Sequence, residues 1–199
     1  MNCIDLFSGA GGLTEGFIRT DYNIIAHVEK EYPASLTLKT RLAYYYLKSI
    51  NSLDKYYDYI KGKITREELY SNVPSKVLDT VINEEINEDS LEKIYKKIDK
   101  LKGRKKIDII IGGPPCQAYS LIGRAASKSK MKGDKRKYLY KHYLQFLERY
   151  NPKYFVFENV RGMLSSKDED GKNIFEKIIK FLSVEIRSFF SSSTKFTWK

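Results

Sequence analysis

The stretch Asn2-Cys3-Ile4-Asp5-Leu6-Phe7-Ser8-Gly9-Ala10-Gly11-Gly12 is an apolar run that ends in a glycine-rich turn. Leu13, Gly16 and Phe17 then recur at helical spacing. A short apolar strand, a tight turn and a helix are the first parts of a parallel β-α-β unit. This stretch therefore predicts an α/β fold that begins with a buried strand.

The same alternation of strand and helix patterns continues along the chain. Further strands are expected at residues 23–28, 77–82, 107–111 and 154–157, and the tyrosine-rich residues 43–76 are expected to form a helical insertion. Helical spacing joins Ala34, Leu38, Leu42 and Tyr45 after Pro33, then Leu91, Ile94, Ile98 and Leu101, then Leu139, Tyr143, Phe146, Leu147 and Tyr150, and finally Ile174, Ile178 and Leu182. This order predicts a parallel sheet with helices on both faces and ligands at the carboxyl ends of its strands.

Composition bounds the class of protein. The chain has 199 residues, of which 42% are hydrophobic and 31% charged, as expected for one soluble globular domain. No apolar run is long enough to span a membrane and the first residues do not resemble a secretory signal, so we expect a cytoplasmic protein. Cys3 and Cys116 are too few for a disulfide framework, and with His27 and His142 they form no metal-ligand spacing, so no metal is predicted.

The positive charge is concentrated. The chain has 36 Lys and Arg against 25 Asp and Glu, a net charge of +11, and residues 120–155 hold ten of these cations against Asp134 and Glu148. A basic segment directly after Cys116 favours a polyanionic substrate such as DNA, because neutralising phosphates supplies much of the affinity for it. A solvated lysine-rich surface would look the same.

Cys116 lies on an unusual turn. Gly112-Gly113-Pro114-Pro115-Cys116-Gln117 follows the apolar run Ile107–Ile111. Glycine and proline fill no core, but they fix the backbone path, so this turn would present a thiol at the end of a strand. The alternative is an inert buried cysteine.

The first glycine turn predicts a nucleoside site. Gly9 and Gly11 would let a ligand approach the backbone at a helix start, and Glu29, at the end of the second strand, would accept hydrogen bonds from ribose hydroxyls. Thr14 stands where the dinucleotide fingerprint has its third glycine, which argues against a pyrophosphate-containing cofactor. A tight strand-to-helix turn is the alternative.

Three segments together resemble the DNA cytosine-5 methyltransferases. Asp5–Leu13 is similar to their S-adenosylmethionine loop, Pro114–Ser120 to their nucleophile turn and Phe157–Val160 to their acidic catalytic segment, in the family's order and spacing. Residues 134–139 resemble a further block more loosely. The resemblance spans about residues 1–182 and implies a Rossmann-like methyltransferase fold, S-adenosylmethionine as cofactor, DNA as substrate and a role in restriction and modification.

The resemblance also assigns roles to residues. It implies that Cys116, Glu158 and Asn159 are catalytic. Lys30 stands where family members often carry an apolar or aromatic residue, and the acid that meets the adenine amino group is Glu85 or Asp89. The implied cofactor residues are Phe7, Ser8, Gly9, Gly11, Gly12, Glu29, Lys30, Glu85, Ile86, Pro114 and Leu139, and the implied substrate residues are Gln117, Ser120, Arg124 and Arg136.

The implied chemistry explains why a thiol and an acid are needed. Carbon 5 of cytosine is a poor nucleophile, so the Cys116 thiolate would add at carbon 6 while Glu158 shares a proton with N3. The target base must leave the stacked duplex for this addition. A thiol-dependent enzyme with thymidylate-type chemistry would share the cysteine without needing Glu29, and a silent DNA-binding remnant would share only the basic segment.

Three family features are absent from the sequence. No Gln-x-Arg segment follows Glu158, and the target-recognition region and the returning segment that completes the family's cofactor pocket are not found. Residues 183–199 also lose clear strand or helix patterns. We therefore expect a sheet that is incomplete at its C-terminal edge and an irregular tail at residues 183–199. The chain would be either a truncated, catalytically impaired methyltransferase or one part of a split enzyme that needs a complementary subunit.

Overall fold

The computed structural model describes residues 1–114, 139–158, 164 and 171–180. The chain divides into two compact units, Met1–Lys105 and Lys106–Lys199. The boundary between the predicted core, residues 1–182, and the predicted tail lies outside the described residues, so these bounds stay predictions.

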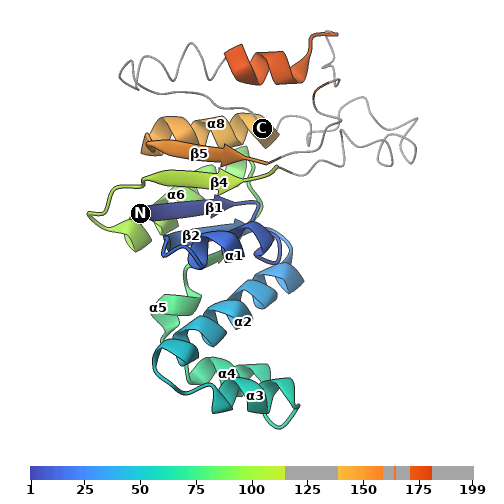
Figure 1. Cartoon of the computed structure of the whole chain (residues 1–199). Helices are drawn as coiled ribbons and strands as arrows, with labels where there is room; N and C mark the ends of the chain where they lie inside the picture. Colours follow the sequence, from blue (N-terminus) through green and yellow to red (C-terminus); the bar gives the residue numbers. More distant parts are fainter. Residues whose placement is uncertain (115–138, 159–163, 165–170, 181–199) are drawn as a thin grey trace, which may run out of the picture. The chain divides into compact units, whose positions relative to one another are not determined.

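The first unit is built on three parallel strands (Figure 1). They are β1 (Asn2–Leu6), β2 (Asn23–Glu29) and β3 (Val81–Asn83), in the order β3-β2-β1. Ile4 and Leu6 of β1 and Ala26 and Val28 of β2 are completely buried. Nearly continuous apolar runs suit strands that are covered on both faces, so these residues fill the centre of the unit.

Helices cover both faces of this three-stranded sheet. Figure 1 shows α1 (Gly12–Ile18) in front of β1 and β2, and α6 (Glu88–Lys102) behind them. At the start of α6 the Asn87 side chain accepts from the Ser90 amide while the Ser90 hydroxyl accepts from the Asn87 amide, which caps the first turn. The buried face of α6 consists of Leu91, Ile94, Tyr95 and Ile98.

The predicted insertion is helical. It comprises the second half of α2 (Tyr32–Ser49), then α3 (Asp54–Ile60), α4 (Arg66–Ser71) and α5 (Ser75–Leu78). A small core of its own holds these helices together and consists of Ala43, Leu47, Leu69 and Val73, with several partly buried tyrosines around it. The insertion therefore has a small hydrophobic cluster of its own beside the core of the sheet.

Two predicted details of this region are wrong. The buried residues of α2 are Ser35, Leu38, Ala43 and Leu47. Of the residues joined by helical spacing in the sequence, only Leu38 is among them. The second half of α2 packs against α3 and α4, and this packing decides which of its residues are buried. The third strand was placed at residues 77–82 but begins at Val81, since α5 takes Ser75–Leu78 into a helical turn.

The second unit contains the parallel pair β4 (Ile109–Gly112) and β5 (Tyr154–Phe157) and the helix α8 (Leu139–Tyr150). The buried Tyr143 of α8 donates its hydroxyl to the carbonyl oxygens of Ile110 and Val156, at 3.0 Å each. One side chain thus anchors α8 to both strands. Residues 174–180 are helical, with Ile174 and Ile178 buried.

The predicted α/β class with parallel strands is confirmed. Within the described ranges, the structure contains no helix with the length and apolar character needed to cross a membrane.

Candidate cofactor and catalytic sites

The loop after β1 has an unusual backbone conformation. Phe7 has a φ of 56°, which is rare for a bulky side chain, and Gly9 has a φ of 55°. The Ser8 amide donates to the Val28 carbonyl at 3.1 Å, and the Ser8 hydroxyl donates to the Asp5 carbonyl at 2.9 Å. These bonds fix the left-handed turn at Phe7, and strain of this kind is typical of ligand sites.

Glu29, at the end of β2, is held by this loop. Its Oε2 accepts from the Gly9 amide and its Oε1 from the Glu31 amide, at 2.7 Å each, and the residue is 8% exposed. A carboxylate has about four acceptor sites. Glu29 therefore keeps acceptor capacity for the hydroxyls of a ribose.

The glycines of the loop differ in the space that surrounds them. A Cβ on Gly11, whose φ is 86°, would lie 2.7 Å from Leu38 Cδ2, so this position is needed for packing against α2. A Cβ on Gly9 or Gly12 would meet no described atom within 4 Å. The backbone at Gly9 and Gly12 thus borders open space in the described part of the chain, and a ligand can approach it there.

Three more of the predicted cofactor residues follow the ends of β2 and β3. The Lys30 ammonium is 3.6 Å from a Glu31 carboxylate oxygen and 3.7 Å from one of Glu85. Asn83, at the end of β3, donates its side-chain amide to the carbonyls of Glu29 and Lys30 at 2.9 Å each. Ile86 is buried and Glu85 is exposed. The ends of β2 and β3 therefore bring Glu29, Lys30 and Glu85 together, and Asn83 is a positioning residue that sequence reasoning missed.

Sequence reasoning also missed a buried polar cluster beneath the loop. Asp5 is 1% exposed and accepts a short hydrogen bond from the Thr14 hydroxyl, and its Oδ2 lies 3.5 Å from Nδ1 of the fully buried His27. Thr14, which replaces the third glycine, thus ties α1 to β1. Two polar residues inside apolar strands, Asp5 and His27, were the available signal.

A second polar cluster joins α1 to α2. The Glu15 carboxylate accepts from Tyr45 at 2.6 Å and from Arg19 and Arg41 at 2.9 Å each. The hydrogen bond from the Tyr45 hydroxyl, followed by the contributions of the two guanidinium groups, lowers the pKa of Glu15. Helical spacing placed Tyr45 on one face with Leu38, and the structure shows that its hydroxyl anchors this cluster.

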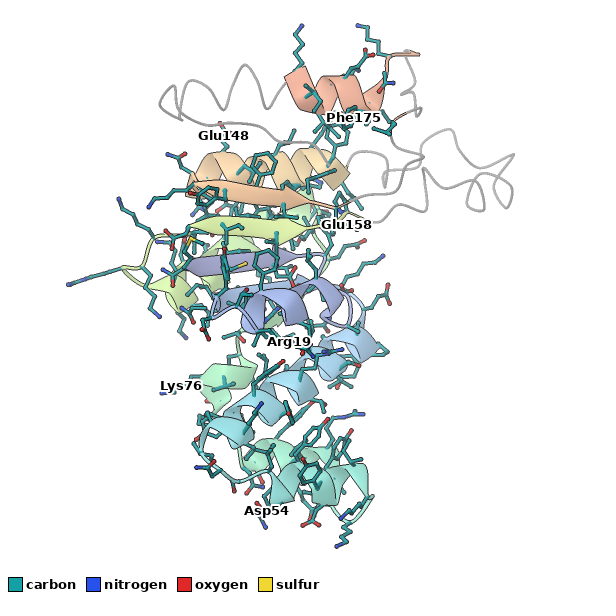
Figure 2. All side chains as sticks on the ribbon, viewed as in Figure 1. Arg19, Asp54, Lys76, Glu148, Glu158 and Phe175 are labelled. Carbon is teal, nitrogen blue, oxygen red and sulfur yellow. The ribbon has the colours of Figure 1, made fainter. Side chains whose placement is uncertain are left out.

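In the second unit, Glu158 lies against Gly113. The Glu158 amide donates to the Gly112 carbonyl at 2.9 Å. A Cβ on Gly113 would lie 2.6 Å from the Glu158 carbonyl oxygen and would also collide with Glu158 Oε2. Figure 2 shows Glu158 at the end of β5. Only glycine at position 113 leaves room for the acid, which is exposed and directly precedes the predicted Asn159.

The remaining predicted residues divide into two groups. Pro114 is buried and Leu139, the first residue of α8, is half-buried. The predicted nucleophile and its neighbours, namely Cys116, Gln117, Ser120, Arg124, Arg136 and Asn159, lie outside the described residues.

Comparisons with known proteins agree on one family. The family model described as C-5 cytosine-specific DNA methylase matches residues 1–69 and 70–185. The chain is 39% identical over 202 residues to the type II methyltransferase M.Bpa9945I of Bacillus paralicheniformis, covering 89% of this chain and 45% of the relative. It is 33% identical to the type II methyltransferase M.DdeI of Desulfomicrobium norvegicum, covering 92% of this chain and 33% of the relative.

More distant similarities extend the same picture. The DNA (cytosine-5)-methyltransferase PliMCI of Paracentrotus lividus is 29% identical over 84% of this chain and 8% of its own length. A crystal structure titled as a prophage-encoded DNA modification methyltransferase of E. coli superimposes with a TM-score of 0.53 at 24% identity, covering 92% of this chain and 38% of that chain. The likeness to this crystal structure concerns the fold alone. The chain spans less than half the length of each of these relatives.

Proposed function

The chain belongs to the C-5 cytosine-specific DNA methylases, and from this premise we propose that it transfers a methyl group from S-adenosylmethionine to carbon 5 of cytosine in DNA. The observation that carries the proposal is the Glu158 carboxylate held against Gly113. It places an acid at the carboxyl end of β5 and beside Gly113, the residue that follows β4. Gly113 precedes Cys116 by three residues in the sequence. In this proposal residues 1–182 form the catalytic core.

The residues of the first unit fit the cofactor. Glu29 has spare acceptor sites for the ribose hydroxyls, the Phe7 ring is available for the adenine, and open space borders Gly9 and Gly12. Glu85 is an acceptor for the adenine amino group, with Lys30 beside it. When bound, S-adenosylmethionine supplies an electrophilic methyl group to carbon 5.

The chain's own residues activate the cytosine. The Cys116 thiolate forms a bond to carbon 6, and the carbon 5–carbon 6 electron pair becomes available as an enamine while Glu158 provides a proton to N3. After methylation a water molecule takes the carbon 5 proton, and the electron pair of that bond restores the carbon 5–carbon 6 double bond as the bond from Cys116 to carbon 6 breaks. The Cys116 thiolate is released, and N3 returns its proton to Glu158. Asn159 helps to hold the flipped base.

The DNA is held by the segment after the nucleophile. Gln117, Ser120, Arg124 and Arg136 are the proposed contacts to the backbone and the everted nucleotide, as suits a basic segment. The type II methyltransferase names of the relatives support a role in restriction and modification.

A second candidate is that the residues present here need complementary sequence for methyl transfer. The observation that favours it is the 45% coverage of the Bacillus relative, together with the lack of a Gln-x-Arg segment after Glu158 in this sequence. The target-recognition region would then come from additional sequence, in the same polypeptide or in a separate subunit. Retained binding of S-adenosylmethionine without methyl transfer, and recovery of transfer on adding that polypeptide, would distinguish this candidate.

A covalent trap tests the mechanism. DNA that contains 5-fluorocytosine should form a stable adduct with the chain only in the presence of S-adenosylmethionine, and Cys116→Ser should abolish it. Cys3→Ala is the matched control, because Cys3 is buried and burial raises the pKa of its thiol. An adduct that persists in Cys116→Ser would contradict the assignment of the nucleophile.

A further inference from the structure

Helix α6 carries a concentration of positive charge that the proposed reaction does not use. Residues 93–106 contain eight lysines and arginines and one acid, Asp99, which gives a net charge of 8 − 1 = +7. The apolar face of α6 is buried against β2 and the sheet core, so the cations line its polar face and the turn that follows.

Part of this charge is neutralised locally. Glu84, which follows β3, forms ion pairs with Lys93 and Lys97, the second at 3.0 Å, and the hydrogen bond from Lys93 is the main cause of its lowered pKa. Lys106 is the first residue of the second unit and is not counted further. The other five cations form no ion pair with a described carboxylate, and we call them the α6 basic strip: Lys96, Lys100, Lys102, Arg104 and Lys105.

The α6 basic strip lies at the end of the sheet opposite the cofactor residues. β3 ends at Asn83 beside Glu29, and α6 begins at Glu88 and returns along the sheet. The helix of such a crossover runs antiparallel to the strands, so its last turn lies where the strands begin. The strip is therefore separate from the cofactor residues of this unit.

Stabilising the end of the helix does not account for the strip. Lys100 and Lys102 are in the last turn of α6, where cations favour the helix dipole. Lys96 precedes that turn, however, and Arg104 and Lys105 follow the end of the helix at Gly103. Three of the five cations thus lack this explanation.

We propose that the α6 basic strip binds the phosphate backbone of duplex DNA as a second contact, separate from the cofactor residues at the other end of β2 and β3. The choice of DNA rests on the proposed function. Four residues of a helix span about 6 Å, so Lys96 and Lys100 are spaced to reach successive phosphates of one strand. An anionic membrane is a poorer fit, because the apolar face that an interfacial helix would insert is buried in the core of the unit.

Equilibrium binding to a labelled duplex of arbitrary sequence, measured against salt concentration with the full chain, tests the proposal. The variant combines Lys96→Gln, Lys100→Gln, Arg104→Gln and Lys105→Gln. It should weaken binding and reduce the slope of log K against log salt by about 3 to 4, because each lost phosphate contact contributes about 0.9. The control variant, Lys55→Gln, Lys61→Gln, Lys63→Gln and Lys76→Gln, removes the same charge from exposed positions of the insertion and should leave the slope nearly unchanged.

The outcomes separate this proposal from the methyl-transfer proposal. Equal loss of binding in both variants would show a nonspecific effect of net charge and would overturn the strip as a site, as would unchanged binding in the strip variant. If the strip variant lost binding to anionic phospholipid vesicles while its binding to duplex DNA stayed intact, the proposal that the strip binds DNA would also be overturned. The readout is binding alone, so failure to methylate DNA leaves this test valid.

Discussion

Gly113 and Glu158 are 45 residues apart in the chain, and no side chain fits between them. A Cβ of residue 113 would lie 2.6 Å from the Glu158 carbonyl oxygen and would collide with Glu158 Oε2 as well. The Glu158 amide donates to the carbonyl of the preceding Gly112. The glycine pair before the predicted nucleophile therefore gives room to the predicted acid. This contact connects the turn after β4 with the end of β5.

Gly113→Ala should displace Glu158 and impair catalysis. We expect the rate of methyl transfer to fall by about tenfold to a thousandfold, because a misplaced general acid loses part of its contribution of about 10²–10⁴. The overpacking should also cost about 1–3 kcal/mol of unfolding free energy. Single-turnover kinetics and chemical denaturation measure the two effects.

Gly16→Ala is the matched control for this substitution. Gly16 is within α1, has no described atom within 4 Å of its ideal Cβ position and should gain about 0.5–1 kcal/mol from the alanine. Normal methyl transfer in Gly113→Ala would disprove the positioning role of Gly113.

Glu29→Gln should weaken binding of S-adenosylmethionine. Both carboxylate oxygens accept backbone amides, from Gly9 and Glu31, whereas a glutamine would turn an NH₂ group toward one of these donors. We expect affinity to fall about tenfold to a hundredfold, measured by calorimetry without DNA. Glu31→Gln alters only an exposed carboxylate near Lys30 and should bind almost normally. Equal effects of the two substitutions would argue against a specific role for Glu29.

Patterns in the sequence predict the parts of this fold that are decided locally. Ile4, Leu6 and Ile94 were predicted to be buried and are buried, because their burial follows from strand and helix period alone. The buried face of α2 was not predictable in this way, since Ala43 and Leu47 are covered by helices that come later in the chain. The start of β3 was wrong for a similar reason: Val77 and Leu78 are apolar enough for a strand but pack as part of the insertion.

The candidate sites show the same division. The glycine turn and Glu29 were recognised because glycines and the ends of apolar strands can be identified from the sequence alone. The supports of these groups were not recognised: Asn83 reaches Glu29 across 54 positions, and the crowding of Gly113 depends on the pairing of β4 with β5. A residue type at a strand end thus indicates a site, while its positioning contacts require the register between strands.

Thr14→Val should destabilise the first unit. Valine keeps the shape of threonine but removes the hydroxyl that donates to the buried Asp5, so a carboxylate that is 1% exposed loses a hydrogen bond. The expected cost is about 1–3 kcal/mol of unfolding free energy, measured by chemical denaturation. Thr14→Ser retains the hydroxyl and should recover most of this loss. If serine were as harmful as valine, the methyl group rather than the hydrogen bond would account for the effect.

Glu15 should make the unfolding free energy of the chain depend on pH. Its pKa is lowered in the folded state, chiefly by the Tyr45 hydroxyl, so the folded state prefers the ionised carboxylate more strongly than the unfolded state does. The resulting stabilisation is present above the unfolded pKa of about 4.3 and is lost as pH falls through the lower, folded pKa. Glu15→Gln should therefore lower the unfolding free energy by about 1 kcal/mol near neutral pH, since hydrogen bonds to a charged group are lost, and by progressively less as the solution is acidified. Urea denaturation at several pH values measures this difference.

Glu92→Gln, at an exposed position of α6, is the control, and its unfolding free energy relative to the unmodified chain should not change in this way with pH. A deficit in Glu15→Gln that stays constant down to acidic pH would mean that the shape of the glutamate side chain, and not its charge, joins α1 to Arg41 and Tyr45 of α2.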